Sequence, residues 1–213
     1  MTFTRKVVSL LAIVCMNMFA GSAQGQQATQ SLEHPKLLTP MTSTELLSTL
    51  RQAHIEQEGV PPNQSRLAMA WAQAALENAH GRSIYNHNIG NVAPVKDQNF
   101  YYHVKKVRYR SYDTFNDGAK AYWRVVMWCK SAFRMFDAGQ PVRAAENLKG
   151  CGYYEAEVEP YVRMLSSLYY HALKSVIPEE ERERQEKERL DRIHADYLTK
   201  AVYTPKCACC VLP

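Results

Sequence analysis

The stretch SRLAMAWAQAALENAH, residues 65–80, constrains the fold of this chain more than any other segment. Its side chains are mostly small or apolar, and the apolar ones recur with the 3.6-residue period of an α-helix. One face of this helix is continuous and needs other elements to cover it. We therefore predict a core built mainly from helices. The residues on the apolar face are Leu67, Trp71, Ala74, Ala75 and Asn78.

A single acid, Glu77, stands near the end of this helix. On the helical wheel it lies at the edge of the apolar face, beside Ala70 and Gln73. A carboxyl group at this boundary loses part of its water, which raises its pKa, and still stays open to a ligand. The pattern allows two interpretations, an ordinary boundary glutamate or a carboxylic acid held at the edge of a groove.

The remaining patterns are mostly helical, with one short β segment. The residues NFYYHVKKVRYRSY, 99–112, alternate aromatic or β-branched side chains with basic ones, which favours two strands and a turn. The predicted fold class is α+β, mainly α, with helices around a small β-hairpin. We expect helices over 44–57, capped by Thr42, Ser43 or Thr44; from 63–65 to 80, ending at a left-handed Gly81; and over 117–139, 141–150 and 159–176.

Four segments are predicted along the 213-residue chain. Residues 1–23 show a basic start, an apolar run and then small residues, the order of a secretory signal peptide. Residues 24–40 are polar, Gln-rich and punctuated by prolines, as in a linker. Residues 41–178 form the expected domain, and 179–213 form a charged tail, helical or flexible, that ends in a cysteine cluster. We expect export to the periplasm or the cell exterior, with membrane contact only through the signal peptide.

The cysteines fall into two groups. Cys129 and Cys151 would close a loop of about twenty residues, and a thiol pair in an exported protein is most simply a disulfide. Cys207, Cys209 and Cys210 stand together in the tail without a second cluster of metal ligands. We interpret them as exposed thiols or as intermolecular disulfides that join two chains into a homodimer.

Charge and composition exclude little by themselves. The net charge of +5 would favour an acidic polymer, either an anionic cell wall or nucleic acid, but part of it lies in the predicted signal peptide. No nucleic-acid motif accompanies the charge, so we expect no such partner. The histidines and the cysteines before the tail have no metal-ligand spacing, and we expect neither a metal nor a cofactor.

Three segments, in order, resemble the bacterial and phage glucosaminidase domains, the mannosyl-glycoprotein endo-β-N-acetylglucosaminidase-like group with a lysozyme-like fold. LAMAWAQAALENAHGRSIYNHNIGNV, 67–92, is similar to the family's alanine-rich helix, glutamate segment and Asn-rich loop. VRYRSYDTFNDGAKAYWRVV, 107–126, resembles its aromatic-Arg-x-Tyr strand with a helix behind it. AAENLKGCGYYEAEVEPYVRML, 144–165, resembles its Gly-Tyr segment followed by a Pro and a Tyr. The likeness covers roughly residues 42–175.

The resemblance implies cleavage of the peptidoglycan glycan strand, with Glu77 as the catalytic acid and Tyr153 near the acetamido group of the sugar. The chemistry agrees, because a glycosidic oxygen leaves readily only if it is protonated as its bond breaks. A carboxylic acid must therefore keep its proton near neutral pH. The expected substrate-binding residues are Tyr85, Asn88, Asn91, Tyr112 and Tyr154, of which Tyr154 is also interpreted as a packing neighbour of Tyr153.

The chain departs from the family at the second carboxylate. Some relatives carry a glutamate in the hairpin, whereas Asp97 is the acid that stands between Ile89 and Val107 here. Either Asp97 is a general base, or Glu77 acts alone while an acetamido group or a muramic hydroxyl attacks the sugar. The bond that is cut, after N-acetylglucosamine or after N-acetylmuramic acid, stays open. Two other functions also stay open: a catalytically silent peptidoglycan-binding module, and a structural component of an envelope-spanning assembly.

Overall fold

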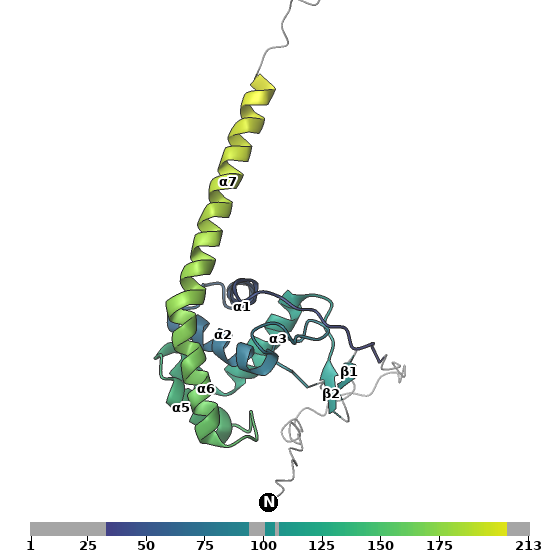
Figure 1. The fold of residues 1–213 in the computed structure, drawn as a ribbon, viewed down its shortest axis with the longest axis vertical. Helices are drawn as coiled ribbons and strands as arrows, with labels where there is room; N and C mark the ends of the chain where they lie inside the picture. Colours follow the sequence, from purple (N-terminus) through teal and green to yellow (C-terminus); the bar gives the residue numbers. More distant parts are fainter. Residues whose placement is uncertain (1–32, 94–100, 105–106, 204–213) are drawn as a thin grey trace, which may run out of the picture.

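The computed structural model describes residues 33–93, 101–104 and 107–203. Over these ranges the protein is mainly helical with one two-stranded antiparallel hairpin (Figure 1), so the predicted fold class is confirmed. The predicted signal peptide, Asp97 and the three tail cysteines lie outside the described residues.

Helix α2 occupies the middle of the helical part, where it contacts α1, α4 and α6. Helix α3 packs on α1, and α5 packs on α4 and α6. The hairpin lies to one side, and α7 projects away from the rest (Figure 1). The described elements are α1 (Ser43–Glu58), α2 (Gln64–Asn78), β1 (Tyr101–Val104), β2 (Val107–Arg110), α3 (Phe115–Trp128), α4 (Lys130–Asp137), α5 (Pro141–Gly150), α6 (Val158–His171), the π-helical turn η1 (Ala172–Val176) and α7 (Ile177–Tyr203).

Helix α1 begins with a capping box at Thr42, which is one of the three residues predicted as its cap. The hydroxyl of Thr42 accepts a hydrogen bond from Glu45 N at 3.1 Å, and Glu45 Oε2 accepts one from Thr42 N at 2.7 Å. These bonds occupy two of the backbone N–H groups that a helix start leaves without partners. Gly59 ends the helix with φ at 74°, a conformation that glycine adopts without a steric penalty.

Helix α2 is buried along most of its length, on more than the one face that its sequence predicts. Trp71 is fully buried, and its indole N–H donates to Ser43 O of α1 at 3.0 Å. On another side of α2, the hydroxyl of Tyr122 donates to Ala70 O at 2.9 Å. These bonds hold the middle of α2 against α1 and α3.

The end of α2 differs from the prediction. The helix stops at Asn78, and the left-handed conformation begins at Ala79, with φ at 53°, two residues before Gly81. The cause is Asn78, whose Oδ1 accepts from Gly81 N at 2.7 Å and whose Nδ2 donates to Ile89 O at 3.0 Å. This buried amide turns the chain early and joins it to the following loop.

The segment 33–40 is hydrogen-bonded to the domain, although it falls within the predicted linker. Leu37 N donates to Asn86 Oδ1 at 2.7 Å, and Asn86 N donates to Leu37 O at 2.9 Å. His34 N donates to Tyr101 O at 2.8 Å, so the segment also reaches the hairpin. The folded part of the described chain therefore begins before α1.

The helix predicted over 117–139 is two helices, α3 and α4, that meet at Cys129. The backbone of Cys129 has φ at −81° and ψ at 76°, which is not helical. Cys129 pairs with Cys151, with Cα atoms 6.0 Å apart, and this confirms the predicted disulfide. In the chain-entropy model, closing such a loop stabilises the fold by about 3 kcal/mol.

Helix α7 continues from α6 through η1, and its first turn packs on the domain. Arg51 of α1 and the buried Glu180 form a two-pronged ion pair, with N–O distances of 2.8 and 3.2 Å. From residue 182 to residue 199 every described side chain is exposed. The described part of the predicted tail is thus a solvated helix. Over the described ranges, no helix is both long and apolar enough to span a bilayer.

Candidate active site

Glu77 lies in the last turn of α2, at the boundary between core and solvent where its place in the sequence put it. Burial raises the pKa of its carboxyl, and a hydrogen bond from Asn91 acts in the opposite direction. The carboxyl therefore keeps its proton to a higher pH than an exposed glutamate does.

Four tyrosines from four parts of the chain lie near enough to Glu77 for its charge to act on their hydroxyls. Burial raises the pKa of each hydroxyl, and the negative charge of Glu77 raises it further. The hydroxyls consequently stay protonated at neutral pH, and that of Tyr122 already donates to Ala70 O at 2.9 Å. These residues are Tyr109 of β2, Tyr122 of α3, Tyr153 between α5 and α6, and Tyr161 of α6.

Gln73 adds an amide to this polar cluster. It lies one helical turn before Glu77 on the same side of α2 and is fully buried. Its amide approaches the hydroxyls of Tyr153 and Tyr161 without a regular hydrogen bond, and this approach lowers the pKa of both. The carboxyl of Glu77 therefore has a buried amide and buried tyrosine hydroxyls near it.

The two asparagines predicted as substrate-binding residues have different surroundings. Asn91 Nδ2 donates to the main-chain oxygen of Glu77 at 3.0 Å. Asn88 is fully buried, and its amide donates to Val92 O and Arg110 O at 2.9 Å each and accepts from Val92 N at 2.8 Å. Asn88 thus joins the loop to β2, whereas Asn91 is hydrogen-bonded to Glu77.

The contacts described for the remaining predicted tyrosines are with groups other than Glu77. Tyr85 is half-buried, with Lys36 Nζ 3.8 Å above its ring. Tyr112 is buried beneath the guanidinium of Arg110. Tyr154 stacks on Tyr161 with ring centroids 3.6 Å apart and donates to a main-chain oxygen of α5 at 3.0 Å. Of the predicted tyrosines, the structure brings Tyr153 to Glu77 and gives Tyr154 the packing role.

Sequence reasoning passed over Tyr109, Tyr122 and Tyr161, which the structure adds to the site. Two of the three carried a signal. Tyr161 is the tyrosine after the proline in EPYVRML, and Tyr109 alternates with the basic residues Arg108 and Arg110 along its strand. A tyrosine between two arginines on a short strand points to the face opposite theirs, and here the Tyr109 hydroxyl is near enough to Glu77 to feel its charge.

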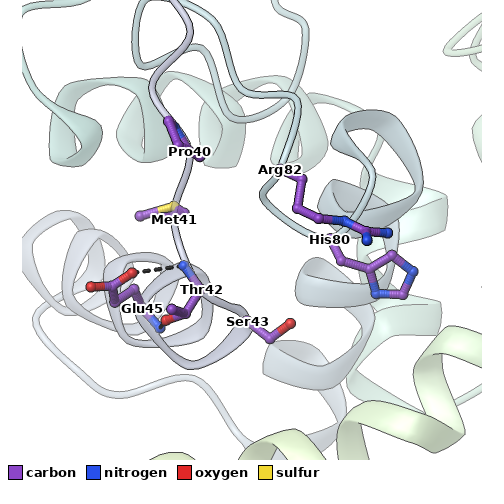
Figure 2. A pocket seen from close by; sticks show the side chains of 7 residues that line it. All are labelled: Pro40, Met41, Thr42, Ser43, Glu45, His80 and Arg82. Carbon is purple, nitrogen blue, oxygen red and sulfur yellow. Dashed lines mark hydrogen bonds between the residues drawn. The ribbon is translucent and has the colours of Figure 1, made fainter.

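An open hollow of about 660 Å³ lies near the same end of α2, between the start of α1 and the turn after α2 (Figure 2). Its lining includes His80 and Arg82, but neither Glu77 nor the tyrosines that face it. Glu45 borders this hollow and is engaged in capping Thr42. We assign no chemistry to it.

The described residues offer no group of three or more His, Cys, Asp or Glu side chains that would hold a metal ion. Asp97, the predicted second carboxylate, is outside the described ranges. The chemistry available at the described site is therefore that of one carboxyl among neutral donors.

Comparison with solved structures finds likenesses to two peptidoglycan or glycoside hydrolases. The glycoside hydrolase domain of FlgJ from Salmonella typhimurium is 19% identical, over 75% of this chain and 99% of that one, with a TM-score of 0.42. A peptidoglycan hydrolase from Sphingomonas sp. A1 is 20% identical, over 65% of this chain and 91% of that one, with a TM-score of 0.47. No family model and no curated protein matches the sequence significantly. Both likenesses are distant, and the function proposed below rests on the site itself.

Proposed function

We propose that the protein is an exported glycosidase that cleaves a β-1,4 bond between N-acetylglucosamine and N-acetylmuramic acid in peptidoglycan. The observation that carries the proposal is the carboxyl of Glu77, whose pKa is raised by burial at the end of α2. The hydroxyls of Tyr109 and Tyr153 stay neutral near it and would offer a sugar uncharged hydrogen-bond partners. The resemblance of three ordered segments to glucosaminidase domains supports the same substrate.

In the proposed reaction Glu77 is the general acid. It transfers its proton to the glycosidic oxygen as the bond to the anomeric carbon breaks, so the leaving sugar departs as a neutral alcohol. The resulting carboxylate then accepts a proton from the hydroxyl that attacks the anomeric carbon. That hydroxyl belongs to water in hydrolysis, after the acetamido oxygen has formed a cyclic intermediate, or to the muramic sugar in transglycosylation.

A second carboxylate would change this mechanism. Asp97 is the candidate general base, and it would activate water directly while Glu77 protonates the leaving group. Asp97→Asn separates the two routes: activity close to that of the wild type supports the single acid, and a loss as large as that of a Glu77 variant supports the pair.

Zymography with purified cell walls is the experiment that tests the proposed function. A zone of clearing is expected around the mature protein. No clearing, together with retained binding to the walls, would instead indicate a silent peptidoglycan-binding module. Neither clearing nor binding would favour a structural component of an envelope-spanning assembly. Mass spectrometry of the fragments identifies the bond, from a reducing N-acetylglucosamine, a reducing muramic acid or an anhydro sugar.

Tyr153 and Tyr154 should respond differently to substitution. Tyr153→Phe removes a hydroxyl that faces Glu77 and should lower kcat about tenfold, the effect of one lost hydrogen bond. Tyr154→Ala removes a stacked ring and should lower the free energy of unfolding by about 3–5 kcal/mol. Turnover assays and urea denaturation of both variants provide the comparison. If Tyr153→Phe loses only stability and Tyr154→Ala only turnover, the two roles are reversed.

We further propose that the chain forms a disulfide-linked homodimer through Cys207, Cys209 and Cys210. Helix α7, about 40 Å long for its 27 residues, leads away from the site, so a link beyond it would leave Glu77 open. The mature chain should run as a dimer on non-reducing gels and as a monomer after reduction. Replacing the three cysteines by serine should leave lysis unchanged. A chain that runs as a monomer under both conditions would rule out the link.

A further inference from the structure

The main-chain oxygen of Glu77 needs a partner from outside α2. A helix leaves its last four carbonyl groups without intrahelical donors, and α2 ends at Asn78. The N–H that would normally reach Glu77 O is that of Gly81, and it donates to the side chain of Asn78 instead. Asn91 Nδ2 replaces that N–H as the donor to Glu77 O, at 3.0 Å. The same amide also lies near enough to the carboxyl of Glu77 to lower its pKa, against the effect of burial.

The backbone holds the Asn91 amide in a fixed place. Asn91 has φ at 50°, a left-handed conformation that asparagine tolerates better than most residues. Its neighbour Gly90 lies so close to the ring of Tyr122 that a Cβ atom would overlap it. On the other side of Gly90, Ile89 O accepts a hydrogen bond from Asn78 at 3.0 Å. The loop is thus fixed to both α2 and α3 where Asn91 leaves it.

We propose that Asn91 is a positioning residue for Glu77, which holds the main chain and the carboxyl of the acid in one geometry from a separate loop. This inference rests on the proposed function, in which Glu77 is the general acid. It replaces the role in substrate binding that the sequence predicts for Asn91.

The contact also has a consequence for the reaction. The titratable groups that face Glu77 are Tyr109, Tyr122, Tyr153 and Tyr161, which are neutral when Glu77 titrates. Burial alone would favour the protonated acid at every stage. The Asn91 amide, held beside Glu77 by its bond to the main-chain oxygen, favours the carboxylate that follows proton transfer, and this carboxylate must then accept a proton from the attacking hydroxyl. The two effects together let one carboxyl serve first as acid and then as base.

Asn91→Gly is the sharpest test, because glycine adopts the same left-handed backbone without strain and deletes only the amide. The pKa of Glu77 should rise by about one pH unit when a donor to its carboxylate is lost. Carbon-13 NMR of the Glu77 carboxyl measures this shift in the mature protein without any substrate. On cell walls, kcat should fall about tenfold and the alkaline limb of the pH profile should move upward by about the same pH interval as the pKa.

Asn86→Gly is a matched control from the same loop. Asn86 has φ at 49°, and its amide holds the N-terminal segment through Leu37 N and Pro35 O rather than Glu77. This variant should lose stability and leave the titration of Glu77 unchanged. If Asn91→Gly titrates like the wild type, the inference is overturned, whether or not the protein lyses walls. If the pKa rises but the wild type shows no lysis, the positioning contact is supported and the proposed function fails.

Discussion

Glu77→Gln should abolish the lysis of cell walls while the protein stays folded. Glutamine keeps the shape of the side chain and loses the proton that the leaving oxygen needs. The loss of a general acid lowers turnover by about 10²–10⁴-fold, which removes visible clearing on a zymogram. Because the wild-type acid must be protonated to act, its activity should fall on the alkaline side of the optimum.

The same substitution should leave the protein at least as stable as the wild type at neutral pH. An unfolded glutamate has a pKa near 4.5, and burial raises the pKa of Glu77 in the folded state. Between these two values the folded protein binds more protons than the unfolded chain, so the stability of the wild type falls as the pH rises. Glutamine does not titrate, and the variant should gain relative to the wild type from pH 4.5 upward.

Thermal unfolding of both proteins across this pH range, beside zymography, measures the two effects together. Glu159→Gln serves as the control, since Glu159 is an exposed acid paired with Arg163 on α6. It should preserve lysis and melt close to the wild type at pH 7, because an exposed ion pair contributes little to stability. Undiminished lysis by the Glu77 variant would refute the acid assignment. A variant that melts well below the wild type at pH 7 would show a structural need for the carboxylate.

The parts of the fold that sequence predicted well are those where local pattern and tertiary packing agree. The apolar stripe of α2 leaves no alternative to burial, and Thr42 is one of the predicted caps of α1. The predictions that failed depended on distant partners. The early end of α2 follows from hydrogen bonds of Asn78, one of which reaches Ile89. The break between α3 and α4 falls at Cys129, which is paired with Cys151, and no proline or glycine at that position predicts it.

In the candidate site, too, the residue with a local sequence signal was predicted, and the residues that depend on distant partners were not. Glu77 stands out in the sequence because it is the one acid on an apolar helix. Its neighbours are single tyrosines on β2, α3 and α6, and no local pattern distinguishes a tyrosine that faces a carboxyl from one that fills a core. The role of Asn91 depends on which carbonyl at the end of α2 lacks a partner. A main-chain carbonyl without a donor is known only from the folded structure, in which the end of the helix and the position of the loop are both fixed.

Gly118→Ala should strongly destabilise the protein. Gly118 lies in the first turns of α3, where alanine would ordinarily favour the helix by about 0.5–1 kcal/mol. Here a Cβ atom would overlap the main-chain oxygen of His87. His87 has little freedom to move, because its N–H donates to Thr39 at 3.1 Å and its ring is hydrogen-bonded to Tyr112 O at 2.8 Å.

The overlap must therefore be relieved by separating α3 from the loop that carries Asn91, and we expect a loss of about 3 kcal/mol or more in the free energy of unfolding. Urea denaturation followed by circular dichroism measures it. Gly150→Ala is the matched control: Gly150 also lies in a helix, α5, and a Cβ atom there would meet nothing within 4 Å. That variant should be neutral or slightly stabilised. If both glycines tolerate alanine equally, α3 and the loop are not in the close contact on which the rigidity of the site depends.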